Sequence, residues 1–211
     1  MSLRLSVQGG VLAALMLLAG CAQPPANAGG QASAPPPAPA QPAPRLPPTE
    51  AASRLPAQAA GFQRGQTLAL RSPTRGVASA GAQEVAYATP NARARAAALV
   101  RLTPRGAGLA DGTASTEAGA AFTQALNDAV HSPDRARKLH ETRRFTLPAG
   151  ATPALSCATL AGTFGRQPVE GLVCAGAMGG NLVQLKVTMP AQQPPLADAQ
   201  AFATAMAQAL R

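Results

Sequence analysis

The cysteines are the residues of this chain best suited to covalent chemistry. Cys157 and Cys174 lie on two predicted strands that flank one turn. In a secreted protein, two cysteines in such positions favour a disulfide. The small loop that it closes would contribute about 3 kcal/mol of stability in the chain-entropy model. A zinc site that also uses His131 and His140 is the alternative, although it lacks the paired-cysteine spacing of structural zinc sites.

The sequence contains no familiar catalytic motif. No Gly-x-Ser-x-Gly segment occurs, and both histidines lie in or beside a basic stretch, so a nucleophilic triad is unsupported. The glycines from Gly106 to Gly112 lack both the Lys-Ser/Thr of a phosphate-binding loop and the spacing of a dinucleotide fingerprint. The carboxylates of residues 61–211 are scattered near arginines, which indicates solvated ion pairs. We expect a non-enzymatic protein without cofactor or metal, with an enzyme of unfamiliar active site as the alternative.

Positive charge is the remaining candidate for a binding function. The formal net charge is +9, and all cationic side chains except Lys138 and Lys186 are arginines. Guanidinium groups bind phosphates and carboxylates bidentately, but a solvated face is the commoner fate of such residues. Two groups of cations are candidate anion-binding residues. The first group falls within ten residues of sequence and consists of Arg135, Arg137, Lys138, Arg143 and Arg144. The second group shares a predicted strand face and consists of Arg93, Arg95 and Arg101.

The same composition argues against a nucleic-acid partner. A chain rich in alanine, arginine, glycine and proline but poor in lysine is typical of a GC-rich genome, so its basic balance carries little weight as a sign of nucleic-acid binding. Anionic lipid headgroups or lipopolysaccharide are physically better partners, because clustered positive charge gains free energy near such surfaces. An envelope protein is the other partner that we consider.

A short apolar stretch precedes the third cysteine. Residues 11–18 read VLAALMLL after a polar start that contains Arg4. This stretch is too short to span a bilayer, which needs about 20 apolar residues. A basic start, a short apolar core and small residues before a cleavage site are typical of a secretory signal. The four residues that end at Cys21, LAGC, resemble the lipobox of bacterial lipoproteins at every position.

The lipobox resemblance implies a membrane anchor. Residues 1–20 would be the signal peptide, removed after Gly20. Cys21 would carry a diacylglyceryl thioether, and its new amino terminus would usually carry an acyl group such as palmitate. Several acyl chains give durable anchoring. Ala22 is not the aspartate that retains many such lipoproteins in the inner membrane, so the outer membrane, facing the periplasm, is favoured. An ordinary signal peptide that happens to contain a cysteine is the alternative.

The residues after Cys21 predict a tether followed by a single domain. Residues 22–60 contain 11 Pro and 13 Ala, a composition that favours extended polyproline conformations and buries little. We therefore expect a disordered tether over residues 21–60, and one periplasmic domain over residues 61–211.

Periodicity predicts the elements of this domain. Apolar residues alternate with polar or charged ones in several segments, as in strands, and the expected strands cover 62–70, 83–89, 93–103, 144–147, 155–164, 169–178 and 182–189. Apolar residues recur every third or fourth position in 113–130, where Thr113 would cap a helix, and in 196–210. Ser132-Pro133 would start a short basic helical turn through His140.

This order of elements predicts an α+β domain with an antiparallel sheet and helices packed on it. Along the chain, the domain begins at Gly61-Phe62 and continues with a strand pair and a helix. The meander over residues 155–189 and the terminal helix come last. The order resembles small bacterial lipoproteins with a fold similar to that of photosystem PsbP and Mog1 proteins. The resemblance would cover residues 61–211 and implies a binding or assembly role, because that fold hosts such roles.

Overall fold

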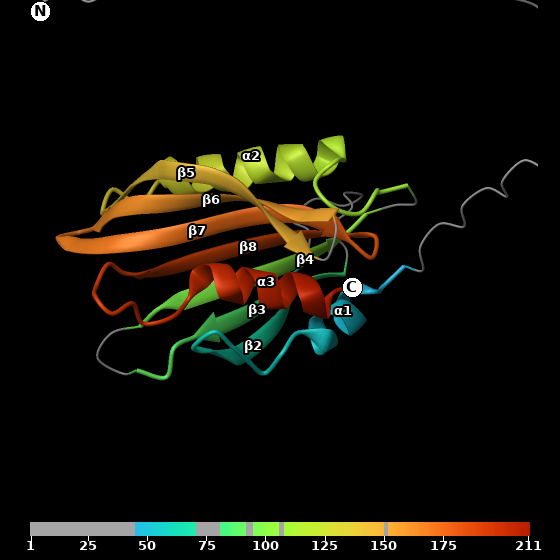
Figure 1. Cartoon of the computed structure of the whole chain (residues 1–211), viewed down its shortest axis with the longest axis horizontal. Helices are drawn as coiled ribbons and strands as arrows, with labels where there is room; N and C mark the ends of the chain where they lie inside the picture. Colours follow the sequence, from blue (N-terminus) through green and yellow to red (C-terminus); the bar gives the residue numbers. More distant parts are fainter. Residues whose placement is uncertain (1–44, 71–80, 92–94, 106–107, 150–151) are drawn as a thin grey trace, which may run out of the picture. The chain divides into compact units, whose positions relative to one another are not determined.

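An antiparallel sheet organises the described part of the chain, with strand order β1-β2-β3-β4-β8-β7-β6-β5 (Figure 1). The computed structural model describes residues 45–70, 81–91, 95–105, 108–149 and 152–211, and these belong to one unit over residues 41–211. The strands are β1 (Gln58–Ala59), β2 (Phe62–Leu70), β3 (Ala82–Ala88), β4 (Ala97–Pro104), β5 (Arg137–Ala149), β6 (Thr152–Phe164), β7 (Gln167–Met178) and β8 (Asn181–Pro190). The helices are α1 (Pro48–Arg54), α2 (Thr116–Val130) and α3 (Ala199–Ala209).

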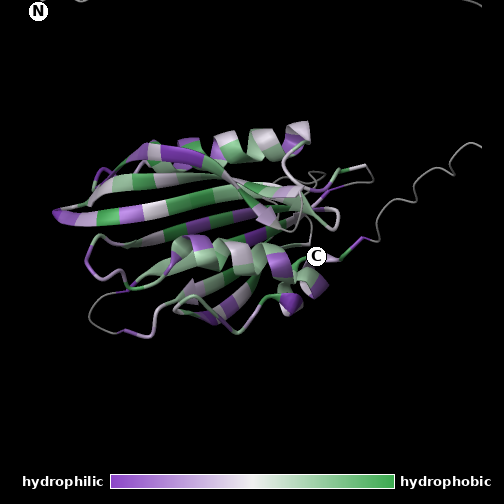
Figure 2. Cartoon of the chain, in the orientation of Figure 1, coloured by the Kyte–Doolittle hydropathy of each residue, from purple (hydrophilic) through white to green (hydrophobic). Residues whose placement is uncertain are grey.

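One face of the sheet forms the larger core with α1 and α3. Phe202 of α3 is fully buried, and its ring lies 4.8 Å from that of Phe62 and 5.0 Å from that of Tyr87, centroid to centroid. The Tyr87 hydroxyl donates a hydrogen bond of 2.9 Å to the Pro56 carbonyl, so its polar end is satisfied. Figure 2 shows the alternation of apolar and polar residues along the strands that produces this buried face.

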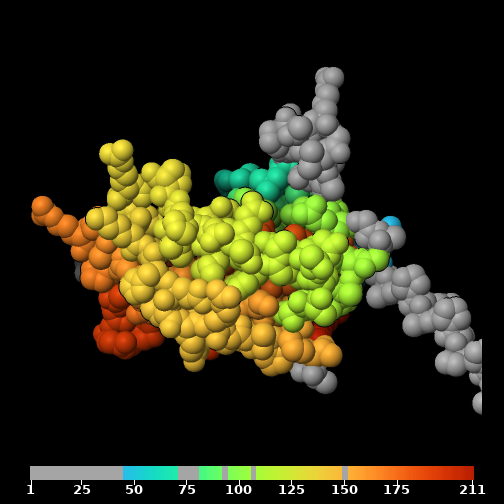
Figure 3. Space-filling view, turned by 90° about the horizontal axis from the view of Figure 1, so that it is seen from above, coloured from blue at the N-terminus to red at the C-terminus, as the bar shows by residue number. Residues whose placement is uncertain are grey.

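The opposite face of the sheet packs against α2. The buried side of this helix, which includes Phe122 and Leu126, contacts Leu160, Val173 and Leu182 of the sheet. Figure 3 shows the surfaces of α2, in yellow-green, and of β5, in deeper yellow, side by side on this side of the domain. Helices on both faces of an antiparallel sheet confirm the α+β class.

The structure contains the predicted disulfide. Cys157 of β6 and Cys174 of β7 are directly paired across the two strands, with Cα atoms 4.1 Å apart. Both residues are completely buried on the face that α3 covers. The bond therefore joins two central positions of the core in a domain whose strands are rich in small side chains.

Two of the predicted helical segments need correction. α2 begins at Thr116 because Ser115, and not Thr113, is its N-cap: the Ser115 hydroxyl accepts a hydrogen bond of 3.1 Å from the Ala118 amide. The helical turn predicted through His140 is wrong, since β5 already begins at Arg137 and pairs with β6. This strand also extends well beyond the predicted residues 144–147, because β6 offers a partner along its whole length.

The boundary between tether and domain also needs correction. Residues 45–60, assigned to the tether, contain α1 and β1, and α1 buries Ala51 and Ala52 in the core. Leu46 is bonded to the turn between β7 and β8 through its amide, which donates to the Gly179 carbonyl at 2.9 Å. Cys21, the predicted signal segment and the rest of the predicted tether lie outside the described residues.

The remaining elements agree closely with the sequence. β2 covers the predicted residues 62–70, and α3, capped by Asp198, buries the predicted side of Ala199, Phe202, Met206 and Leu210. None of the helices in the described ranges is both long and apolar enough to cross a membrane.

Candidate functional site

One face of the sheet is covered only in part by a helix. α2 lies over β5, β6, β7 and β8, and Gln184 of β8 donates a hydrogen bond of 3.2 Å to the Ala121 carbonyl of the helix. Directly paired residues of neighbouring strands have their side chains on the same face, so this face continues beyond α2 onto β4, β3 and β2. We call this continuation the open face; its side chains are Leu68, Glu84, Ala86, Ala97, Leu99, Arg101, Lys186 and Thr188.

The open face exposes large apolar side chains. Leu68 is 52% exposed and Leu99 is 38% exposed, and Phe164, at the adjoining end of β6, is 50% exposed. These three are the large apolar residues that stand out as exposed among the described residues. Their gathering around one face is a feature of interaction surfaces, whereas single exposed apolar residues are ordinary.

A groove at one end of the open face gathers positive charge. The cavity has a volume of about 410 Å³, and its charged lining residues are Arg95 just before β4, Arg137 at the start of β5 and Lys186 of β8. Leu99 and Phe164 contribute apolar walls. We call this cavity the cationic groove. A smaller cavity of about 200 Å³ adjoins it, since Leu99 and Lys186 line both.

Lys186 is half-buried in this groove. Burial lowers the pKa of its ammonium group, the positive charge of Arg137 lowers this pKa further, and the carboxylate of Asp128 on α2 opposes the shift. The direction of the shift shows that desolvation and repulsion outweigh the help from Asp128. Burial and the nearby Arg137 therefore both disfavour the charged form of Lys186 in this groove.

Arg101 of the open face has its own counterion. Its guanidinium donates two hydrogen bonds, of 3.2 and 2.9 Å, to Oε2 of Glu84 on β3. Its charge is thus balanced on the sheet itself. The predicted grouping of Arg93, Arg95 and Arg101 on one strand face is therefore divided: Arg95 lines the groove, Arg101 is paired, and Arg93 lies outside the described residues.

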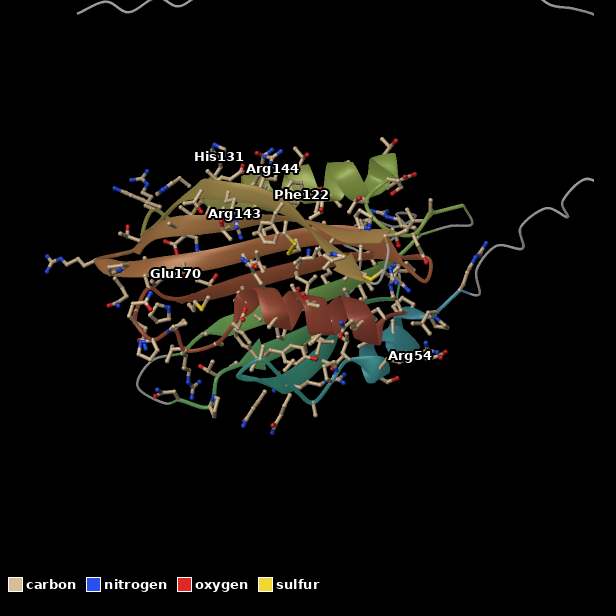
Figure 4. All side chains as sticks on the ribbon, viewed as in Figure 1. Arg54, Phe122, His131, Arg143, Arg144 and Glu170 are labelled. Atoms are coloured by element: carbon tan, nitrogen blue, oxygen red, sulfur yellow. A yellow bond between two sulfur atoms is a disulfide. The ribbon has the colours of Figure 1, made fainter. Side chains whose placement is uncertain are left out.

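The predicted cluster around residues 135–144 is also divided, because neighbouring residues of a strand point to opposite faces. Arg143 lies 4.7 Å above the Phe145 ring, while Arg144 lies 5.3 Å above the Phe122 ring of α2 (Figure 4). Arg144 is also paired with Glu141 through two hydrogen bonds of 2.9 Å, and this pairing lowers the pKa of the Glu141 carboxyl. Arg143 and Arg144 therefore do not share one face of β5.

Other predicted site residues stay at the surface. Arg135 and Lys138 are exposed, and neither lines the cationic groove; only Arg137 of this run does so. His131 is the exposed C-cap of α2 and His140 is exposed on β5. Since both core cysteines are in the disulfide, the alternative zinc site lacks its thiolate ligands. The described residues contain no group of three or more His, Cys, Asp or Glu able to hold a metal.

Lys186 is the functional candidate that sequence reasoning missed. It lies on β8, where Val183, Leu185 and Val187 are buried and the alternate positions face α2 or the open face. A signal was present in the sequence, because Lys186 is the one charged residue of a strand that otherwise reads as apolar and neutral. A cation in such a strand must lie on a face that water or a ligand can reach.

A second cavity lies on the other face, beside the start of α3. It has a volume of about 980 Å³, and its lining is largely apolar apart from Glu170, Asp198, Gln200, Thr142 and Thr159. The carboxylate of Asp198 is engaged in capping α3, and the two threonine hydroxyls hydrogen-bond to each other at 2.8 Å. The residues that line this cavity include no Ser, Cys, His, Lys or Arg, and its two threonine hydroxyls are bonded to each other, so Glu170 has no basic partner there.

Comparison of the chain with protein-family models, with curated proteins and with solved structures finds no match.

Proposed function

We propose that this protein is a lipid-anchored lipoprotein of the bacterial envelope whose domain acts as a non-enzymatic binding or assembly accessory. The anchor rests on the LAGC sequence that ends at Cys21 and on the apolar stretch before it. In this proposal the protein is attached to the outer membrane and faces the periplasm, because Ala22 follows the lipidated cysteine. A disulfide buried in the core is consistent with such an oxidising compartment.

The observation that carries the binding role is the open face with its cationic groove. Exposed apolar side chains lie beside cations on a face that α2 leaves uncovered. An apolar centre with a polar or charged border is how interfaces are commonly built. A partner that presents acidic groups next to an apolar surface would complement this face.

The cavity beside Glu170 offers less support for an enzyme. General acid-base catalysis needs a titratable group within hydrogen-bond reach of a second reacting group. Among the other polar groups of this cavity, the Asp198 carboxylate caps α3 and the two threonine hydroxyls bond to each other, so none is paired with Glu170. Binding of anionic lipid or lipopolysaccharide is the better second candidate, because the cationic groove offers three cations to a single ligand.

For the domain we also propose a fold related to that of PsbP and Mog1 proteins. The supporting observations are an antiparallel sheet with α2 on one face and α3 on the other, and the order of strand pair, helix, meander and terminal helix along the chain. Shared fold by itself transfers no function. The proposed binding role therefore depends on the open face and not on the fold.

The test is a crosslinked pull-down of the lipidated protein from its native membranes. We expect a reproducible envelope partner that is lost with Cys21→Ser and also with the double variant Arg137→Glu, Lys186→Glu. The matched control is Lys138→Glu, which changes an exposed cation of the same strand outside the groove. A partner retained by the groove variant, or recovered equally without the lipid, would contradict the proposal.

A second measurement separates the anchor from the binding role. Radiolabelled palmitate should be incorporated into the wild-type protein and not into Cys21→Ser. Absence of label in the wild type would reject the lipoprotein assignment, whatever the pull-down recovers.

A further inference from the structure

The cationic groove is charged with one sign only. Arg95, Arg137 and Lys186 line it, and its remaining lining residues carry no charge: Ala97, Leu99, Phe164, Gln167, Val169, Thr188, Met189 and Pro190. The three cations come from separate parts of the chain, and the pairing of β4 with β8 brings two of these parts together. Arg137 pairs with Phe164 at the adjoining end of β6.

None of these three cations forms a salt bridge within the described residues. The salt bridges found there join Arg54 to Glu50, Arg101 to Glu84 and Arg144 to Glu141. Asp128 acts on Lys186 electrostatically without forming a salt bridge to it. Like charges gathered in a partly desolvated cavity are unfavourable, and an anion bound between them would relieve both the repulsion and the loss of hydration.

The walls of the groove indicate that the anion carries an apolar part. Leu99 and Phe164 present exposed hydrocarbon to the cavity, and Val169, Met189 and Pro190 complete its apolar lining. The volume of about 410 Å³ is within the range of small-molecule sites, which is roughly 300–1,000 Å³. The adjoining cavity beside α2 has Glu84, Arg101 and Asp128 in its lining, so the apolar part of the anion is assigned to the groove itself.

We propose that Arg95, Arg137 and Lys186 bind the phosphate group of an amphiphilic phosphate ester, whose hydrocarbon part lies against Leu99 and Phe164. A phosphate group has enough oxygen atoms to accept hydrogen bonds from two guanidinium groups and one ammonium group at the same time. This assignment rests on the proposed function, since it takes the open face as the binding surface, and it names the ligand class. The ester has two possible sources, a soluble metabolite or the headgroup of a membrane lipid.

In the first experiment, the full chain with Cys21→Ser is titrated with dihexanoyl phosphatidic acid below its critical micelle concentration. Isothermal titration calorimetry measures the binding. The Cys21→Ser substitution keeps the protein's own lipid from competing. We expect saturable binding that Lys186→Gln and Arg137→Gln each weaken at least tenfold. Lys138→Gln, the matched control, should leave the Kd unchanged. Absence of binding, or an equal loss with Lys138→Gln, overturns the proposal.

A second arm tests the apolar part of the site. Inorganic phosphate should bind at least tenfold more weakly than the ester, and Leu99→Ser should weaken the ester without weakening inorganic phosphate. Equal affinities for both probes would overturn the amphiphile assignment. Thermal unfolding of each variant, compared with the parent, ensures that a loss of binding is not a loss of folding.

A third arm identifies the source. Vesicles of phosphatidylcholine containing phosphatidic acid are compared with pure phosphatidylcholine vesicles by flotation. Binding to the first and not to the second supports a membrane headgroup, and binding to soluble ester alone supports a metabolite. If no phosphate ester binds but groove variants still lose a crosslinked envelope protein, this inference fails while the proposed function stands. If the groove variants change neither ester binding nor recovery of an envelope protein, this inference and the proposed function both fail.

Discussion

The side-chain amide of Asn181 donates a hydrogen bond of 2.6 Å to the backbone carbonyl of Leu46, across 135 residues of sequence. The same amide contacts the Gly179 carbonyl at 3.2 Å, and the Leu46 amide donates to that carbonyl at 2.9 Å. Asn181 is 1% exposed. The N-terminal segment of the domain is therefore joined to the first residue of β8, whereas Lys186 of the cationic groove lies five residues further along that strand, about 17 Å away.

Removal of this amide should destabilise the domain. Asn181→Ala leaves the partly buried Leu46 carbonyl without its side-chain donor, and we expect the free energy of unfolding to fall by about 1–2 kcal/mol, measured by urea denaturation. The loss is moderated because Oδ1 of Asn181 has no hydrogen-bond partner within the described residues. Gln192→Ala, at an exposed amide that bonds to the Pro194 carbonyl, is the control and should cost less than about 0.5 kcal/mol. Equal losses from Asn181→Ala and Gln192→Ala would show that the hydrogen bond between Asn181 and Leu46 is not stabilising.

The N-cap of α2 gives a second prediction. Ser115→Ala removes the acceptor for the Ala118 amide and should lower the free energy of unfolding by about 1 kcal/mol. Thr113→Ala, two residues earlier, should change it by less than about 0.5 kcal/mol, since Thr113 lies outside the helix. Chemical denaturation of the two variants side by side decides between them; a larger loss from Thr113→Ala would contradict the structure.

The disulfide should be the largest single stabilising feature tested. Reduction of the bond between Cys157 and Cys174 should lower the free energy of unfolding by about 3 kcal/mol. Thermal unfolding with and without dithiothreitol measures this effect. The double variant Cys157→Ala, Cys174→Ala should no longer respond to the reductant, whereas Cys21→Ser should respond like the wild type. Insensitivity of the wild type would mean that the bond is absent in solution.

The Lys186 pKa predicts a pH dependence. Carbon-13 NMR of labelled lysine should place this pKa below that of free lysine, and the chain's two lysines make assignment simple with a Lys138→Gln control. Arg137→Gln should raise it by removing repulsion, and Asp128→Asn should lower it further. Because the folded state binds fewer protons than the unfolded state between the two pKa values, the contribution of Lys186 to stability rises with pH across that interval. A lower Lys186 pKa in Arg137→Gln, or a higher one in Asp128→Asn, would contradict the arrangement of charges in the groove.

The sequence by itself determined the elements with strong local periodicity. The alternation of Ala98, Val100 and Leu102 with exposed neighbours specifies the buried face of β4, and the spacing of Phe202 and Met206 specifies that of α3. These patterns are readable because the side-chain period of a strand or helix depends on neighbouring residues alone. The pairing of Cys157 with Cys174 follows in the same way from one hairpin.

Tertiary structure alone decided which cations lie close to one another. Arg143 and Arg144 are adjacent in sequence but lie on opposite faces of β5, whereas Arg95, Arg137 and Lys186 are distant in sequence and line one groove. The physical reason is that strand order, here β4 beside β8, is set by contacts between distant segments that bury the common core. Local periodicity contains no information about that order. The same holds for α1. The composition around Ala51 and Ala52 predicts a tether, and only the core formed with the sheet buries these two side chains.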